Sequence, residues 1–371
     1  MEEKLVTLAT HSYTRAELLK SRLESEEIDC YLQNVNLIQG SEGGVKVRVR
    51  QSDMEKALRI VMEINKNYEV EKIQYELKSD IRKILVPVNF SEHSKNAAKF
   101  ALSIAHKFSA EVFLFHSYFS YASEVISVTD THATYTNLDL VVKEIEENAK
   151  ADLEAIYIEL EDILVRNDIE NVAINYGLSL GEPEEEILNF IRNYKPDFIV
   201  ASEPKEKKGK LSNIINNLVN DIIVPVLIIP ENYVFENIYD IDIPKKLVYT
   251  TNFDETDYLA LRKLITITKP LNIDIDLMHI CNEDIIEKCD KVKLDHFVQY
   301  FLEVSSDIDI STALMRNKDV LNGILDYVKE NEIDFLAITT RKRDILEKLV
   351  TPSITLKLLE KLEIPVLVFH G

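Results

Sequence analysis

The sequence predicts an α/β protein in which two doubly wound, parallel-sheet domains follow a small α+β domain. The main observation is that three apolar segments occur twice, in the same order. They are RKILVPVNF (82–90) with KKLVYTTNF (245–253), PDFIVAS (196–202) with IDFLAIT (333–339), and VPVLIIP (224–230) with IPVLVFH (364–370). A repeat of this length is too long for a solenoid unit and indicates tandem copies of one domain. Strands that alternate with helices over such a unit favour a parallel sheet.

Composition narrows the class of protein further. A chain of 371 residues is long enough for two or three domains, each with its own core. The formal net charge of −21 argues against nucleic-acid binding, because phosphate contacts need clustered Lys and Arg. No segment approaches the roughly 20 apolar residues of a membrane span, and the acidic N-terminus is unlike a signal peptide. We therefore expect a cytoplasmic protein with neither nucleic-acid nor membrane partners.

The segment 1–75 differs in pattern from the rest of the chain. Its elements follow the order β-α-β-β-α, which is typical of a ferredoxin-like α+β domain. Its last strand alternates valine with a basic residue, so that one face carries Lys46, Arg48 and Arg50. A solvent-facing strand explains this basic stripe, and docking of an acidic partner is the alternative. The predicted elements are a strand at 4–12, a helix at 13–27, strands at 28–34 and 43–50, and a helix at 51–68.

The first repeat, placed at residues 80–232, reads as five strands joined mainly by helices in a Rossmann-like sheet. Its strands are continuous apolar runs, as expected when helices cover both faces of a parallel sheet. Ser91 is placed to open the helix after the first strand. The acidic segment 141–164 has apolar residues at helical spacing and predicts an amphipathic layer over the sheet. The expected strands lie at 82–89, 110–118, 171–175, 196–203 and 224–230, and other helices at 91–109 and 182–195.

The second repeat, placed at residues 243–371, follows the same order of strands and helices. The closing strand of each repeat, VPVLII and IPVLVF, is apolar and expected at a sheet edge. An unprotected apolar edge invites pairing with another strand. Two copies in one chain can pair edge to edge around a pseudo-two-fold axis, and Pro225 and Pro365 are tolerated at such strand starts. We therefore predict an intramolecular pseudo-dimer, with higher oligomers left open.

Ligands of open parallel sheets bind beyond the carboxyl ends of the strands. The relevant segments here are 87–90, the turn 180–182 and the loop after 202. The run ILVPVNFSEHS, the GEPEEEI turn and the closing VPVLIIP resemble the universal stress protein family, and LVYTTNFDET and IPVLVF repeat the likeness more faintly. This resemblance covers residues 80–371. Residues 1–70 resemble a short bacterial ferredoxin-like domain that is described as signal-transducing.

The resemblance implies a nucleotide cleft, with departures from the family pattern. Nucleotide-binding members place an Asp after the first strand and a Gly-x-x-Gly…Gly-Ser/Thr pattern after the fourth, because glycines let backbone N–H groups approach phosphates. Here Asn89 and Asn252 take the Asp positions, and Asn supplies no charge. The second repeat has Thr339, Lys342 and Pro352-Ser353 in place of the glycines, so we expect that site to be inactive.

The first repeat keeps more of the pattern, although its loop is shorter than the family's. Ser202 and Lys205 replace the first two glycines, and Ser212-Asn213 replace Gly-Ser. Gly209 could be a displaced remnant. The neighbouring lysines could attract an anion, but lysines in such a cluster more often belong to a solvated loop. Asn89 could cap the following helix instead of binding a ligand. The candidate cleft for ATP or a related nucleotide comprises Val88, Asn89, Gly181, Ser202, Gly209, Ser212 and Asn213.

Catalytic and metal motifs are missing from the sequence. There is no Gly-x-Ser-x-Gly, His-Glu-x-x-His, P-loop or Gly-x-Gly-x-x-Gly. The three cysteines lack metal-ligand spacing, and the pair Cys281 and Cys289 is given no role. His93 and His106 share one helix and are expected to be surface histidines. We therefore expect neither catalytic nor metal-binding residues.

Three hypotheses for function follow. The first is a non-enzymatic, stress-responsive regulatory or interaction protein with protein partners and degenerate ATP sites. The second is a nucleotide-binding switch in which the first repeat holds ATP, with slow hydrolysis left open. The third is that the ferredoxin-like domain binds a small effector or an acidic protein.

Overall fold

The computed structural model describes residues 4–11, 13–34, 45–61, 81–118, 132–202, 222–233, 246–253, 255–281, 288–304, 309–340 and 354–370. The chain divides into two compact units. The first contains Met1–Ser79, Lys246–Lys269 and Asp274–Glu332, and the second contains Asp80–Lys245, Pro270–Ile273 and Ile333–Gly371.

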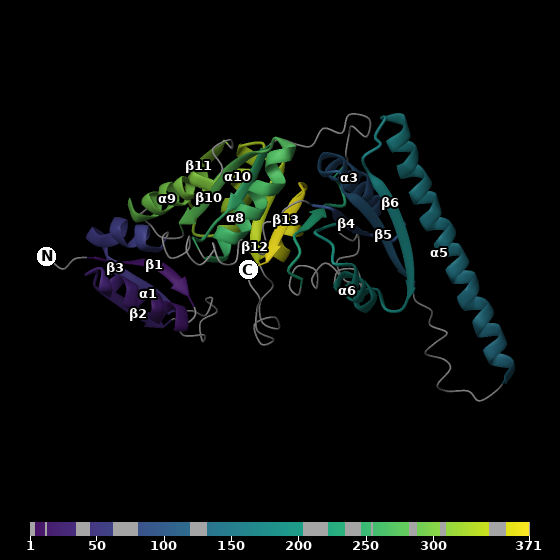
Figure 1. Ribbon diagram of the computed structural model, residues 1–371, viewed down its shortest axis with the longest axis horizontal. Helices are drawn as coiled ribbons and strands as arrows, with labels where there is room; N and C mark the ends of the chain where they lie inside the picture. Colours follow the sequence, from purple (N-terminus) through teal and green to yellow (C-terminus); the bar gives the residue numbers. More distant parts are fainter. Residues whose placement is uncertain are drawn as a thin grey trace. The chain divides into compact units, whose positions relative to one another are not determined.

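The N-terminal segment forms a three-stranded antiparallel sheet in the order β1-β3-β2, drawn in purple in Figure 1. Val47 and Val49 of β3 are fully buried, and the strand alternates between buried and half-buried residues as predicted. The basic stripe is bonded to its neighbours: Arg48 donates to the carbonyl oxygen of Leu5 at 2.8 Å. The elements are β1 (Leu5–His11), α1 (Tyr13–Ser25), β2 (Cys30–Asn34), β3 (Val45–Arg50) and the 3-10 turn η2 (Gln51–Asp53).

The first repeat contributes a parallel sheet in the order β6-β5-β4-β7-β8 to the second unit. This order is that of a doubly wound sheet, so the predicted fold class is confirmed. Ile84, Leu85 and Val86 in β4 are fully buried, as expected of the central strand. The strands are β4 (Lys83–Pro87), β5 (Glu111–Tyr118), β6 (Ala173–Leu180), β7 (Phe198–Ser202) and β8 (Val226–Ile229).

In the described part of the first repeat, three helices pack on this sheet. α3 (Glu92–Phe108) begins at the predicted cap, because the Ser91 hydroxyl oxygen accepts from the amide of Ser94 at 3.2 Å. α5 (His132–Arg166) is the long helix beside β6 in Figure 1, and it buries apolar side chains from Ala149 onward. α6 (Pro183–Tyr194) packs the ring of Phe190 on Phe115 of β5, with 4.3 Å between ring centroids. The predicted acidic, amphipathic helix at 141–164 is therefore confirmed as part of α5.

The second repeat places its first three strands in the first unit and its last two in the second. β10 lies between β9 and β11, and all three are parallel. β12 is parallel to β13. The 3-10 turn η3 (Lys269–Leu271) has Lys269 in the first unit and its other two residues in the second. The first-unit elements are β9 (Lys246–Thr250), α8 (Glu255–Thr268), β10 (Asp274–Cys281), α9 (Lys288–Val304), β11 (Ile310–Arg316) and α10 (Val320–Glu330). Those of the second unit are β12 (Phe335–Thr340), α12 (Ile354–Leu359) and β13 (Val366–His370).

The closing strands of the two repeats pair with each other within the second unit. β8 and β13 are antiparallel, with Leu227 opposite Leu367. Val226 faces Val368, and Ile228 faces Val366. Since VPVLIIP aligns with IPVLVFH, equivalent residues exchange places about the leucine pair, and the register is locally two-fold symmetric. β8 is therefore an inner strand, hydrogen-bonded to β7 on one side and β13 on the other.

The two histidines of α3 have polar contacts. His93 lies 3.4 Å from a carboxylate oxygen of Glu231, and His106 contacts the Asn171 side chain at 2.9 Å. Both predicted surface histidines therefore have polar partners outside their own helix.

Among the described residues, no helix combines the length and the apolar character that crossing a bilayer requires.

Candidate functional site

The carboxyl end of β4 is held by a histidine of the neighbouring strand. The amide of Val88 donates to the carbonyl oxygen of Phe115 at 2.9 Å, and the Val88 carbonyl oxygen lies 2.7 Å from Nδ1 of His116. Because a carbonyl only accepts, Nδ1 of His116 carries the proton. Burial lowers the pKa of His116, which favours the neutral ring. The centroid of the Phe90 ring lies 4.1 Å from that of the His116 ring, and the backbone of Phe90 has a φ of 65°.

Asn89 is occupied by its own turn. Its side-chain oxygen accepts from the Ser91 amide at 3.2 Å and from the Ser91 hydroxyl at 2.6 Å. Its backbone amide donates to the Ser94 hydroxyl at 3.3 Å. These bonds build an Asx turn that leads into α3. Of the two sequence interpretations, the structure favours a local role at the start of the helix, with Ser91 as the capping residue itself.

Gly181 lies at the end of β6, next to β5. Its amide donates to the Tyr118 carbonyl oxygen at 3.0 Å, and its own carbonyl accepts from the Ser117 hydroxyl at 2.8 Å. A Cβ at this position would lie 2.7 Å from Cγ of Glu186, so glycine is required by a close approach. Glu186 also accepts a hydrogen bond from Ser179. The space beside Gly181 is therefore taken by a carboxylate.

Carboxylates also line the first turn of α6. Glu184, Glu185 and Glu186 lie in that turn, where they interact favourably with the helix dipole. Negative side chains there oppose the binding of a second anion by like-charge repulsion. The helix terminus nearest Gly181 is thus not a free anion site.

Only some of the predicted cleft residues lie in the part of the chain that the structure describes. Val88 and Gly181 are both hydrogen-bonded to β5. Ser202 ends β7 and pairs with Ile229 of β8. Gly209, Ser212 and Asn213, together with the lysines at 205–210, lie outside the described residues, as do Lys342 and the Pro352-Ser353 pair.

The second repeat has the same framework at the end of β9. The Thr251 amide donates to the Met278 carbonyl oxygen at 2.9 Å, and its carbonyl oxygen lies 2.7 Å from Nδ1 of His279. Phe253 has a φ of 61°, and its ring lies 4.4 Å from the His279 ring. Burial lowers the pKa of His279 as it does in the first repeat.

The sequence analysis did not identify these two histidines. A signal was available, because alignment of FHSY (115–118) with MHIC (278–281) puts a histidine at the same position in both repeats. Each of them lies 28 residues beyond the carbonyl that it contacts.

The turn after β9 contains a buried acid that the first repeat lacks. Asp257 takes the position of Ser94 and is 4% exposed. It accepts from the Tyr249 hydroxyl at 2.9 Å, the Thr251 hydroxyl at 2.8 Å and the Asn252 amide at 2.9 Å. The Asn252 amide therefore donates to a carboxylate, whereas the Asn89 amide donates to the hydroxyl of Ser94.

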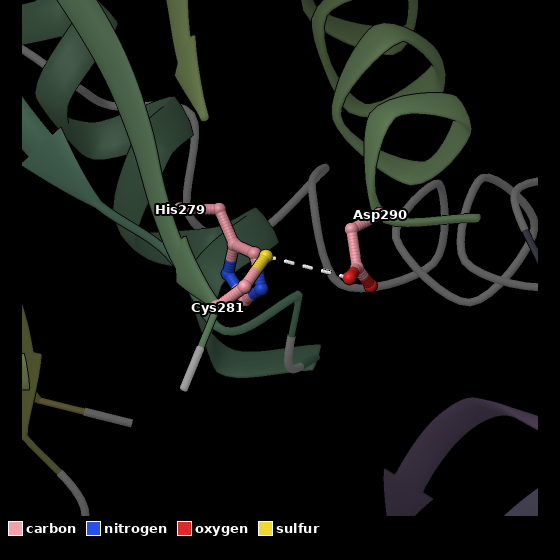
Figure 2. Close-up of side chains that lie close together, drawn as sticks. All are labelled: His279, Cys281 and Asp290. Atoms are coloured by element: carbon pink, nitrogen blue, oxygen red, sulfur yellow. Dashed lines mark hydrogen bonds between the residues drawn. The ribbon is translucent and has the colours of Figure 1, made fainter. Parts of the chain in front are cut away.

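A group of potential metal ligands in the second repeat includes His279 (Figure 2). His279, Cys281 and Asp290 each offer a ligand atom, and these atoms all lie within 4.8 Å of one another. The Cys281 thiol donates to Oδ2 of Asp290 at 3.4 Å. From the sequence we expected no metal site, because the cysteines lack metal-ligand spacing and no motif places a histidine beside Cys281. The alternation His-x-Cys at the end of a strand was the available signal for two of the three residues.

Comparisons with known proteins agree with this architecture. The model of the universal stress protein family matches residues 80–230 and again 244–370. Residues 6–65 match a family described as "Putative prokaryotic signal transducing protein". A comparison with curated proteins finds no significant match.

Solved structures to which the chain is similar have low sequence identity to it. A universal stress protein from Archaeoglobus fulgidus DSM 4304 is 15% identical, with a TM-score of 0.54, over 79% of this chain and 97% of that one. A functionally unknown protein from Pseudomonas aeruginosa PAO1 is 13% identical, with a TM-score of 0.51, over 79% and 94%. A universal stress protein in complex with cAMP is 13% identical, with a TM-score of 0.30, over 34% and 97%.

The two family matches together cover most of the chain, and both fall on the repeats found in the sequence. The chain belongs to the universal stress protein family, of which it carries two tandem domains.

Proposed function

We propose that this chain is a non-enzymatic regulatory or interaction protein of the stress response, acting in the cytoplasm, with degenerate ATP sites in both repeats. The observation that carries the proposal is the placement of carboxylates around both candidate clefts. Glu186 fills the space beside Gly181, and Asp257 lies below Asn252. Phosphates need bare backbone amides and positive charge, and carboxylates offer neither. The N-terminal domain is then the sensor or docking module for a protein partner.

Calorimetric titration of the full chain with ATP, ADP and cAMP tests this proposal. We expect no saturable heat and no shift of the melting temperature at millimolar nucleotide, since a ligand that binds the folded state at 100 times its Kd stabilises it by about 2.7 kcal/mol. Saturable binding of one nucleotide per chain would contradict the proposal. It would instead support the nucleotide switch.

The nucleotide switch is the second candidate, and one difference between the repeats favours it for the first repeat only. The Asn89 amide donates to the neutral hydroxyl of Ser94, whereas in the second repeat the corresponding acceptor is the carboxylate of Asp257. Introducing the acid in the first repeat, Ser94→Asp, should abolish nucleotide binding if the switch operates. The same variant leaves the titration unchanged if the first site is degenerate.

We further propose that the two repeats form an intramolecular pseudo-dimer. The symmetric register of β8 and β13 supports it, because edge-to-edge pairing of equivalent strands is what two tethered copies would adopt. The double variant Val226→Cys, Val368→Cys should form a disulfide within one chain, since directly opposed residues come within disulfide range.

Mass spectrometry of the oxidised variant identifies the bond, and light scattering gives the mass of the species. The control pair Val226→Cys, Val366→Cys is out of register by a diagonal of about 7–8 Å and should remain reduced. A covalent dimer in place of the intrachain bond would show that the strands pair between chains, against the proposal.

A further inference from the structure

We infer that the second repeat holds a zinc ion on His279, Cys281 and Asp290. This inference rests on the ligand geometry of β10 and α9, and it is independent of whether the clefts bind nucleotides. Thiolate, imidazole and carboxylate are the ligand types that zinc takes, whereas magnesium and calcium prefer oxygen alone. Three protein ligands leave a fourth tetrahedral position for water.

β10 presents two of the ligands with the correct spacing. His279 and Cys281 are two residues apart on one strand, so their side chains point to the same face. The position of Cys281 is fixed by the residue that follows β11, because the Asn317 amide donates to the Cys281 carbonyl oxygen at 3.1 Å. Cys281 is 5% exposed, so its sulfur is shielded from bulk solvent.

His279 is oriented for coordination through Nε2. Its Nδ1 proton is held by the Thr251 carbonyl oxygen at 2.7 Å, which leaves the Nε2 lone pair for a metal. Metal-binding histidines almost always donate their other ring N–H to a carbonyl or carboxylate in this way. The ring of Phe253, tilted by 41° against the imidazole with 4.4 Å between the ring centroids, further restricts its rotation.

Asp290 completes the set from the first turn of α9. Its Oδ2 lies 3.4 Å from Cys281 Sγ, close to the edge of about 3.6 Å that tetrahedral zinc gives between sulfur and oxygen ligands. Its Oδ1 faces the ammonium group of Lys293 at 3.8 Å. The two oxygens therefore have separate partners, and Lys293 would hold the carboxylate in place while Oδ2 binds the metal.

The first repeat provides the internal control. His116 makes the same bond to a strand-end carbonyl oxygen, and the ring of Phe90 lies against it with a similar tilt. Tyr118 stands at the position of Cys281, so the thiolate is missing there. The histidine framework alone is thus common to both repeats, and the ligand set belongs to the second.

The experiment uses the full chain, reduced and stripped with a chelator. Zinc is then added in competition with a chromophoric chelator. We expect one zinc ion per chain, and cobalt in its place should give the thiolate-to-metal absorption of a tetrahedral site. Cys281→Ser should remove that absorption and weaken zinc binding at least tenfold, the lower end of about 10–100-fold for losses of supporting contacts alone.

Further variants separate a built site from adventitious binding. His279→Gln and Asp290→Asn should weaken zinc binding by a similar factor, whereas His116→Gln should bind zinc as the unmodified chain does. Circular dichroism confirms that each variant is folded, and serine at 281 can keep the hydrogen bond to Asp290. Absence of stoichiometric zinc in the unmodified chain, or equal zinc affinity in Cys281→Ser, would overturn the inference.

Discussion

Replacing Leu227 by aspartate is expected to lower the free energy of unfolding by about 3 kcal/mol or more. The change places an unpaired carboxylate in the middle of β8, where Leu227 is 3% exposed, and a buried charge without a partner is strongly destabilising. Urea unfolding followed by far-ultraviolet circular dichroism measures the loss.

The size of this effect depends on β8 being an inner strand. β7 and β13 flank it, and its four residues are all buried. At a sheet edge, the carboxylate could reach water and the loss would be small. The matched control is Ile223→Asp, a few residues earlier, where the side chain is 77% exposed and the change should stay within about 0.5 kcal/mol. Equal losses for the two variants would place β8 at an exposed edge and contradict the pairing.

The fold was predictable because the apolar runs carry the information locally. A segment such as residues 84–88 is apolar throughout, as expected of a strand that is covered on both faces. In the N-terminal domain, the alternation of Val45, Val47 and Val49 likewise identified the buried face of β3. The contact of Arg48 with the Leu5 carbonyl oxygen was not predictable, because it depends on which strand lies beside β3.

The candidate site was less predictable, because its contacts join residues that are distant in sequence. Asn89 was placed at the end of a strand correctly, but its partners, Ser91 and Ser94, emerge only from the conformation of the turn. Asp290 reaches Cys281 only because α9 packs against β10. No spacing rule on the linear chain connects these two residues.

Comparison of the two repeats separates framework from chemistry. Both repeats have the same framework. A histidine ring is hydrogen-bonded to the carbonyl oxygen at the end of a strand, and a phenylalanine with positive φ lies next to that histidine. The residue that accepts a hydrogen bond from the backbone amide of the Asn differs between the repeats. It is the neutral Ser94 for Asn89 and the acid Asp257 for Asn252. The two repeats therefore differ in the charge of this acceptor, while Phe90 and Phe253 keep the same positive φ.

Removal of that acid is expected to have an effect as large as that of the strand variant. Asp257→Ala should lower the free energy of unfolding by about 3–5 kcal/mol, because three donors lose a charged acceptor in a buried site. The Tyr249 hydroxyl is the most costly of them, since Tyr249 is 0% exposed and its side chain has little access to water. Thermal and urea unfolding of the full chain measure the loss.

Three control variants show whether the acid or the packing is responsible. Asp257→Asn keeps one acceptor oxygen and should lose less than alanine does. Ser94→Ala in the first repeat removes a neutral acceptor and should cost about 1 kcal/mol. Asp295→Ala, on the exposed side of α9, should change stability by no more than about 0.5 kcal/mol. If Asp257→Ala were as mild as Asp295→Ala, the three hydrogen bonds could not be holding the turn, and the second repeat would keep its cleft geometry by packing alone.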